Sequence, residues 1–181
     1  MVTIKWETTH IREIDWDIIK VHIRKDPELS ILELCYEFGL RRNEALYVRE
    51  DSLCIDNLNV SHQIKGDFSR LESKLPKQNS ARRIPYSVSE MSRTHLIKIM
   101  RENEKSNASP AQINFKWRDL MNELGFDYDI HDCRHSFCRR IVRNHDIKMA
   151  MEFCGHKSIE TTNGYLQSKT EYNHQKLLMP A

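Results

Sequence analysis

Four residues in the last third of the sequence have the side-chain types of a phosphoryl-transfer site: His131, Arg134, His156 and Tyr165. An arginine keeps its charge and can bond two phosphate oxygens with its planar fork. A histidine exchanges protons near neutral pH, and a tyrosine hydroxyl can act as a nucleophile. No acidic metal-binding cluster accompanies these residues. The set therefore suits attack by a tyrosine on a phosphodiester while fixed cations hold the phosphate.

The segments around these residues resemble the C-terminal signature of the tyrosine recombinase (phage integrase) family. That signature reads roughly H-x-L-R-H-T-F, then L-G-H, then T-T-x-x-Y. Here the corresponding segments are 131–137 (HDCRHSF), 154–156 (CGH) and 161–165 (TTNGY). Cys133 and Cys154 replace the usual leucines, and Gly164 precedes the tyrosine. These changes affect packing rather than the reactive groups. The resemblance covers nearly the whole chain, from about residue 15 to residue 166.

The resemblance implies a role for each of the four side chains. Tyr165 would be the nucleophile, and Arg134 would be the second catalytic arginine. His131 would assist removal of the tyrosine proton, and His156 would hydrogen-bond the scissile phosphate. Taken singly, each has an ordinary alternative as a solvated arginine, a partly buried histidine or a packing tyrosine. With a helix expected from residue 132, Arg134 would stand in its first turn, at an end that also attracts phosphate.

An upstream element resembles the one that carries the family's first arginine. Residues 39–46 read GLRRNEAL, against the family element G-L-R-x-x-E-A-L. The resemblance makes Arg41 the catalytic arginine and Glu44 its orienting or structural partner. The alternative is that Gly39 only ends a helix and that Arg41 lies on the surface.

The family also has a catalytic lysine on a β-hairpin, some eight residues before a proline. Residues 77–85 (KQNSARRIP) have that spacing, so Lys77 is the candidate general acid for the leaving 5′ oxygen. Lys74 and Lys65 compete with it because the hairpin loop is long, and a lysine in such a loop is commonly just a solvated charge. Four arginines are further expected to contact DNA, namely Arg42, Arg82, Arg139 and Arg140.

A zinc site is the competing interpretation of the same region. Its ligands would be drawn from His131, Cys133, His135, Cys138, Cys154 and His156. Their spacing is not that of a standard finger or knuckle, and a cysteine also serves as a small buried hydrophobe. We therefore expect no metal and no cofactor, with arginines supplying the positive charge.

The elements that must position these residues are mainly helical. Apolar spacing predicts helices over 15–25, 31–38, 88–104, 111–124, 132–143 and 146–153. Short strands are predicted over 52–56, 58–64 and 81–86, with a polar stretch over 65–80. The predicted fold class is mainly α with one small antiparallel sheet (α+β), and the resemblance identifies it as the tyrosine recombinase catalytic-domain fold.

The bulk properties set limits on the class of protein. A length of 181 residues suits one domain, with a core over about 15–166 and a tail over 167–181. The family's N-terminal core-binding domain is not expected in this chain. A net charge of +2 permits nucleic-acid binding without arguing for it. Five cysteines without a C-x-x-C pair, and no signal-peptide pattern, favour a reduced cytoplasmic setting.

These features predict a site-specific recombinase of a phage or other mobile element that cuts and rejoins double-stranded DNA through a 3′-phosphotyrosyl link. The resemblance implies a homotetramer on DNA, and the isolated domain is expected to be a monomer. Two alternatives remain: a type IB topoisomerase-like enzyme that rejoins the original strand, and a non-catalytic DNA-binding regulator on the same fold. The complete set of six candidate catalytic residues argues against the regulator.

Overall fold

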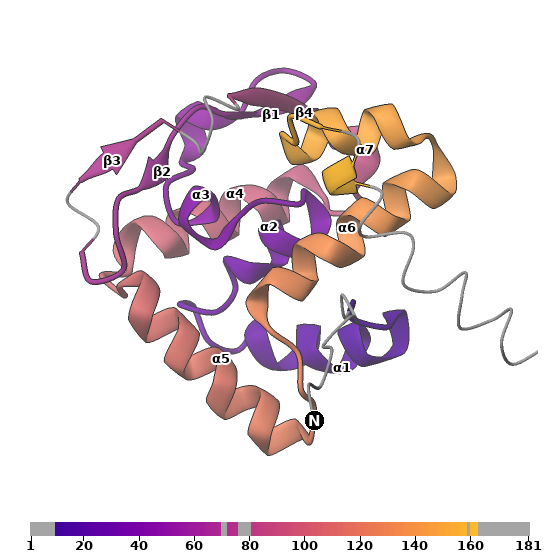
Figure 1. Cartoon of the computed structure of the whole chain (residues 1–181). Coiled ribbons are helices and arrows are strands. Elements are labelled where there is room, and N and C mark those ends of the chain that lie inside the picture. Colours follow the sequence, from indigo (N-terminus) through magenta and orange to yellow (C-terminus); the bar gives the residue numbers. More distant parts are fainter. Residues whose placement is uncertain (1–9, 70–71, 76–80, 159, 163–181) are drawn as a thin grey trace, which may run out of the picture.

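The computed structural model describes residues 10–69, 72–75, 81–158 and 160–162. Within these ranges the chain is mainly helical, with four short strands (Figure 1). The elements in chain order are α1 (Glu13–Ile23), α2 (Leu32–Glu37), α3 (Arg42–Ala45), β1 (Asn57–Val60), β2 (Gln63–Ile64), β3 (Ser73–Lys74), β4 (Arg82–Pro85), α4 (Arg93–Lys105), α5 (Pro110–Leu124), α6 (Ile130–Asn144) and α7 (Ile147–Cys154).

Helix α6 forms the centre of the core, where it packs against α2 and α7 (Figure 1). Its buried residues include Cys133, Phe137 and Ile141, at the i, i+4 and i+8 spacing of one helix face. Phe137 lies against Gly39, where a Cβ atom would stand only 2.3 Å from the ring. Gly39 also has a φ of +63°, in the left-handed region that favours glycine. This glycine therefore lets α6 approach the turn that leads directly into Arg41.

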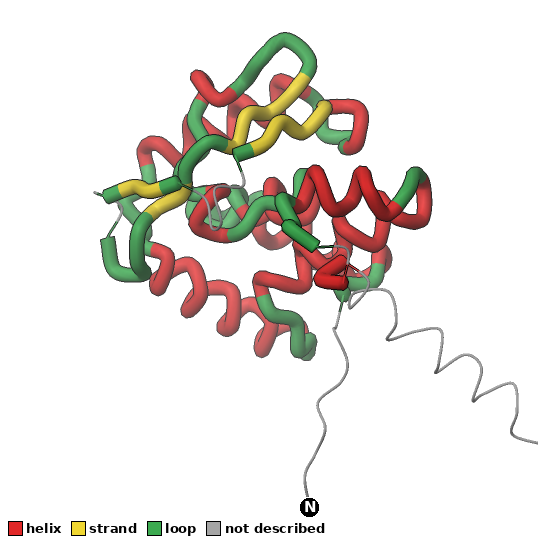
Figure 2. Tube along the Cα trace, turned by 45° about the horizontal axis from the view of Figure 1, so that its top comes forward, coloured by secondary structure: helices red, strands yellow, loops and turns green. Residues whose placement is uncertain are grey.

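The strands form two separate antiparallel pairs rather than the single sheet that was expected (Figure 2). Strand β1 pairs with β4, and β2 pairs with β3 in a hairpin that places Gln63 opposite Lys74. The strand predicted over 52–56 is wrong, because Ser52 ends a short 3-10 helix (Glu50–Ser52) and Leu53 makes only an isolated bridge to Leu58. There the Ser52 hydroxyl accepts a hydrogen bond from the Arg49 backbone N–H at 3.2 Å, a local bond that competes with strand pairing.

For two of the helices, a side-chain cap explains why the helix begins at a different residue from the one predicted. Helix α4 begins at Arg93 rather than residue 88, since Ser92 accepts a hydrogen bond from the backbone N–H of His95. Helix α6 begins earlier than residue 132, since Asp129 caps it by accepting from the His131 backbone N–H at 2.8 Å. His131 therefore lies inside the first turn of α6. None of the helices described here is both long and apolar enough to cross a membrane.

Candidate active site

Arg41 precedes the first turn of α3, and Glu44 fixes it through two contacts. One Glu44 carboxylate oxygen accepts from the Arg41 backbone N–H at 2.8 Å, and the other accepts from Arg41 Nη1 at 3.0 Å. The first contact is the one that an N3 glutamate makes with an N-cap backbone. The Arg41 side chain is still 22% exposed. The expected pairing of these two residues thus holds the guanidinium in place and leaves part of it open to solvent.

Glu44 is itself fully buried and lies within reach of two further arginines. Arg82 binds it with both terminal nitrogens, at 3.1 and 2.8 Å, and Arg134 Nη1 lies 3.9 Å from its carboxylate. Burial raises the pKa of Glu44, but the surrounding arginines outweigh burial and lower the pKa to about 2. The carboxylate is therefore ionised at neutral pH. Its single negative charge is shared among three guanidiniums, which leaves this region positively charged.

Arg134 is 2% exposed and is the only one of the three that comes from α6. It donates to the carbonyl oxygen of Gly39 at 2.6 Å and to that of Cys154. These contacts join α6 to the turn before Arg41 and to the end of α7. Its Nε atom has no hydrogen-bond acceptor among the described residues. The expectation of a guanidinium at the helix N-terminus is wrong, because α6 begins at Ile130 and Arg134 lies deeper in the helix, turned towards the interior.

His156 follows α7 by two residues, and its ring Nδ1 lies 3.0 Å from the Thr162 hydroxyl. Burial, and after it the positive charges of Arg134 and Arg41, lower the pKa of His156 to about 3. The imidazole is therefore neutral at physiological pH. A neutral imidazole can donate one hydrogen bond and accept another, but it adds no charge to the site.

His131 lies at the surface of α6 and contacts a second histidine. Its ring meets that of His135 edge-on, with 4.6 Å between centroids. His135 is buried, and burial together with the adjacent His131 lowers the pKa of His135 to about 3. The resemblance to the recombinase family assigned no catalytic role to His135, which was considered only as a possible zinc ligand. The sequence spacing could have predicted this contact, because residues 131 and 135 are one helical turn apart.

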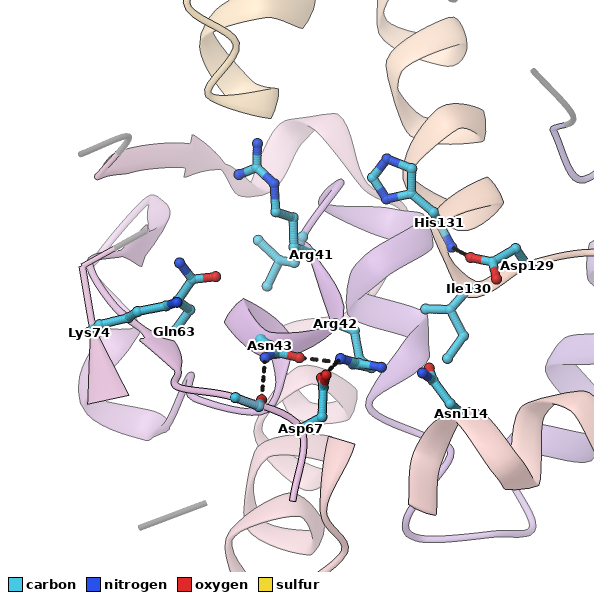
Figure 3. Close-up of a pocket in the computed structure, with 12 residues that line it drawn as sticks. Arg41, Arg42, Asn43, Gln63, Asp67, Lys74, Asn114, Asp129, Ile130 and His131 are labelled. Atoms are coloured by element: carbon cyan, nitrogen blue, oxygen red, sulfur yellow. Dashed lines mark hydrogen bonds and ion pairs between the residues drawn. The ribbon is translucent and has the colours of Figure 1, made fainter. Parts of the chain in front are cut away.

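Arg41 and His131 lie on opposite sides of a cavity of about 500 Å³ (Figure 3). Its walls come from α3, the β2–β3 hairpin and the N-terminal ends of α5 and α6. The hairpin is joined to α5 by a hydrogen bond from the Ala111 backbone N–H to the Asp67 carbonyl at 2.9 Å. We call this cavity the Arg41–His131 groove.

Two of the six candidate catalytic residues, Lys77 and Tyr165, lie outside the described residues, so their roles remain predictions. Of the two competing lysines, Lys74 lines the groove from β3 (Figure 3). Lys65 instead makes an exposed ion pair with Glu72 at 2.6 Å. Thr162, whose hydroxyl meets His156, precedes Tyr165 by three positions in the sequence.

The DNA-binding role predicted for Arg82 is wrong. Its side chain is 4% exposed, and its guanidinium faces Glu44 and the Phe153 carbonyl. Strand β4 alternates, with Arg82 and Ile84 buried and Arg83 between them exposed. A strict period-two interpretation of this strand would have placed Arg82 on the inner face.

The other three arginines predicted to bind DNA occupy two different places. Arg42 lines the Arg41–His131 groove and makes an ion pair with Asp67 at 2.5 Å. Arg139 and Arg140 line a different cavity, of about 470 Å³. Arg140 also donates to the Tyr36 and Glu37 carbonyls at the end of α2, where a cation is favourable. DNA contact by these three stays a prediction.

The zinc interpretation gains no geometric support from the described part of the chain. No group of three or more histidine, cysteine, aspartate or glutamate side chains there is arranged to hold a metal ion. Cys133, Cys138 and Cys154 are instead fully buried in the hydrophobic core.

The family model described as Phage integrase family matches residues 17–172, which include every candidate catalytic position. The chain belongs to the phage integrase family. Its relatives include the tyrosine recombinase XerD of Lacticaseibacillus casei, 29% identical over 154 residues that cover 79% of this chain and 51% of XerD. The tyrosine recombinase XerC of Rickettsia peacockii (strain Rustic) is 28% identical over 80% of this chain and 48% of its own length. This integrase-family chain thus spans about half the length of the curated relatives it matches.

Solved structures of integrases and recombinases share the fold. A Tn1549 transposon integrase in complex with a circular intermediate DNA gives a TM-score of 0.71 at 13% identity, covering 97% of this chain and 68% of that one. A lambda integrase dimer bound to a COC′ core site gives 0.67 at 13% identity, covering 89% and 48%. The XerA recombinase gives 0.65 at 15% identity, covering 99% and 67%. The mainly helical fold with small antiparallel sheets is therefore that of the integrase catalytic domain, as predicted.

Proposed function

We propose that this integrase-family chain is the catalytic domain of a site-specific recombinase that cuts and rejoins DNA by tyrosine transesterification. The observation that carries the proposal is the group formed by Glu44, Arg41, Arg82 and Arg134, which we call the Glu44 centre. The buried Glu44 carboxylate lies close to both Arg41, which precedes α3, and Arg134 of α6, two residues far apart in the sequence. Arg41 at an open groove, with Arg134 buried near the same carboxylate, provides the fixed positive charge that a phosphodiester under attack requires.

In the proposed reaction, the Tyr165 hydroxyl oxygen attacks the scissile phosphorus and forms a 3′-phosphotyrosyl bond. The bond between phosphorus and the 5′ oxygen breaks, and Lys77 gives a proton to that oxygen, so that a 5′ hydroxyl leaves. His131 takes the proton of the tyrosine. A 5′ hydroxyl of a partner strand then attacks the phosphotyrosyl phosphorus and gives its proton to Lys77. The bond between phosphorus and the Tyr165 oxygen breaks, and His131 returns the proton to that oxygen, which frees the enzyme. Because each step exchanges one phosphoester for another, the chemistry consumes no high-energy cofactor.

The geometry of the described residues supports different roles for the individual side chains of the site. Arg41 is partly exposed at the groove and contacts the phosphate, while Arg134 lies behind it. Burial strengthens the electrostatic effect of the Arg134 charge, because little water screens it. His156 is neutral and beside these arginines, which suits a hydrogen-bond donor to a phosphate oxygen. The arginines together supply the positive charge that a divalent cation supplies in metal-dependent phosphoryl transfer.

We infer that the substrate is double-stranded DNA and that the active assembly is a tetramer on DNA. Support for a DNA substrate comes from the solved neighbours, which include the Tn1549 integrase and the lambda integrase in complex with DNA. A role in a phage or another mobile element is part of the proposal, since the structural neighbours include the Tn1549 transposon integrase and the lambda integrase.

The test is a covalent trap. The chain is incubated with a nicked suicide duplex that covers the junction of its own element, in EDTA, and the products are separated on a denaturing gel. A slower-migrating DNA adduct is expected with the wild type and with the control Tyr172→Phe, and no adduct with Tyr165→Phe. An adduct that persists in Tyr165→Phe would exclude this nucleophile. No adduct with the wild type, both alone and joined to an N-terminal DNA-clamping domain, would contradict the enzymatic proposal and favour a DNA-binding regulator.

A second assay separates recombination from topoisomerase-like activity. Supercoiled plasmid carrying the site is incubated with the chain, alone and with a labelled partner duplex. Strand transfer to the partner duplex is expected if the enzyme is a recombinase. Relaxation without transfer would favour the type IB topoisomerase-like alternative.

A further inference from the structure

Arg82 is a buried cation whose chemistry the proposed reaction does not use. It lies on the inner face of β4, and its side chain is 4% exposed. Burying a guanidinium is costly unless its charge is balanced and its N–H donors are bonded. Its contacts should therefore reveal what the protein gains from keeping an arginine at this inner position.

The guanidinium of Arg82 joins three elements of the site. Its terminal nitrogens donate to both carboxylate oxygens of Glu44, at 3.1 and 2.8 Å. Its Nε donates to the carbonyl oxygen of Phe153 at 2.6 Å. Phe153 is the penultimate residue of α7, and His156 follows it by three positions. One planar side chain thus links β4, the carboxylate that holds Arg41, and the helix end that presents His156.

This arrangement fixes the direction of the Glu44 carboxylate. Arg41 binds Glu44 through its backbone and through one terminal nitrogen, and both contacts require the carboxylate to keep its orientation. A bidentate partner on the opposite side restricts rotation of the carboxylate. The Phe153 carbonyl is in the last turn of α7, where backbone oxygens lack helical donors, so the bond to Nε also anchors that end.

We propose that Arg82 is a positioning residue, which holds the Arg41 guanidinium and the His156 end of α7 in register around Glu44. This inference rests on the proposed function. Arginine is needed because a lysine ammonium cannot reproduce a planar fork that bonds a carboxylate with two nitrogens and a carbonyl with a third. Arg82 acts through Glu44 and the α7 backbone and does not itself touch the phosphate.

The inference is tested with Arg82→Met, Arg82→Lys and the control Arg83→Met. Arg83 is the neighbouring exposed arginine of β4, so the control removes the same charge from the outer face of the same strand. The suicide duplex is used under single-turnover conditions at saturating protein. Three quantities are measured for each variant: the rate constant of adduct formation, the final fraction of DNA trapped, and the Kd for the uncleaved duplex.

Arg82→Met is expected to lower the rate constant roughly 100-fold, since a small misplacement of a catalytic group costs about that much. Its Kd should stay within about twofold of wild type, because a buried side chain makes no DNA contact. Arg82→Lys keeps the charge that balances Glu44 but loses the fork, so its rate constant should stay at least roughly tenfold below wild type. Arg83→Met should react at the wild-type rate.

The two measures of reaction distinguish positioning from a merely structural role. A variant that is only less stable would trap a smaller fraction of DNA, while its folded molecules would react with the wild-type rate constant. That result would overturn the inference, as would a weakened Kd that accounts for the whole loss of rate. If Arg82→Met does not fold, a wild-type rate constant for Arg82→Lys would overturn it equally. A wild-type chain that forms no adduct, both alone and joined to an N-terminal DNA-clamping domain, would instead contradict the proposed function itself.

Discussion

The Glu44 centre and the Arg41–His131 groove both carry positive charge, but they hold it in different ways. Around Glu44, Arg82 and Arg134 are almost fully buried, and both guanidiniums donate to carboxylate or carbonyl oxygens, although Arg134 Nε has no acceptor among the described residues. In the groove, Lys74 and His131 are exposed, and Arg42 is 19% exposed. Arg41 belongs to both regions. The buried centre therefore fixes geometry, whereas the groove offers polar and charged groups that solvent and DNA can reach.

The comparison implies that changes in the two regions should affect different measured quantities. A buried charge that is already held in place costs little reorganisation when the transition state forms, so its loss should appear in the rate of cleavage. An exposed charge acts mainly on the phosphate backbone of bound DNA, so its loss should appear in affinity and salt dependence. The predictions below follow this division in order of decreasing effect.

The largest effect is expected from Arg134→Ala. Removing a preorganised cation from a buried site should raise the barrier to cleavage by about 3–4 kcal/mol, which corresponds to a reaction roughly 150- to 900-fold slower. Single-turnover adduct formation on the suicide duplex measures this loss. A reduction of less than about tenfold would mean that the buried centre does not act on the scissile phosphate.

A smaller, pH-dependent effect on stability is expected from Glu44. Its folded-state pKa of about 2 lies below the ordinary value of 4.5, so the ionised carboxylate stabilises the fold above pH 4.5. This stabilisation, on the order of 3 kcal/mol, should be lost as the pH falls from 4.5 towards 2. Urea unfolding measures the free energy of unfolding of the wild type and of Glu44→Gln, and the difference between the two should narrow below pH 4.5. A difference that stays constant would show that the charge of Glu44 does not stabilise the fold.

The smallest effect is expected in the groove, from Arg42→Ala. The substitution should weaken DNA binding less than about tenfold and reduce the slope of log Kd against log salt by about one. The cleavage rate at saturating DNA should not change, because Arg42 pairs with Asp67 rather than with Glu44. Fluorescence anisotropy across a salt series measures both the affinity and the slope. An unchanged slope would remove Arg42 from the DNA-binding surface.

The sequence predicted the helical elements and several partners in the site, but not how each side chain is buried. The match of residues 39–46 to the family element paired Glu44 with Arg41, and the structure places them together. Local spacing could not reveal that Arg82 and Arg134 converge on the same carboxylate, because those contacts join α3, β4 and α6. Capping decided the boundaries, since Asp129 starts α6 before the apolar pattern begins.

Errors in the sequence-based predictions arose mainly where a charged residue was assumed to face solvent. Arg82 lies on the inner face of a strand, where its charge is acceptable only because Glu44 is opposite. The strand predicted near residue 52 failed for a different reason, since the Ser52 hydroxyl bonds the local backbone. In both cases a specific partner outweighed the general preference of the residue type.

The most direct test of the division between the two regions compares Glu44→Gln with Arg42→Ala on the same duplex. The single-turnover cleavage rate at saturating DNA and the Kd are measured for both. We expect Glu44→Gln to lower the rate roughly 100-fold with an unchanged Kd, and Arg42→Ala to weaken the Kd with an unchanged rate. If both variants changed the same quantity by similar factors, the buried centre and the groove would not have separate roles, and the account would be contradicted.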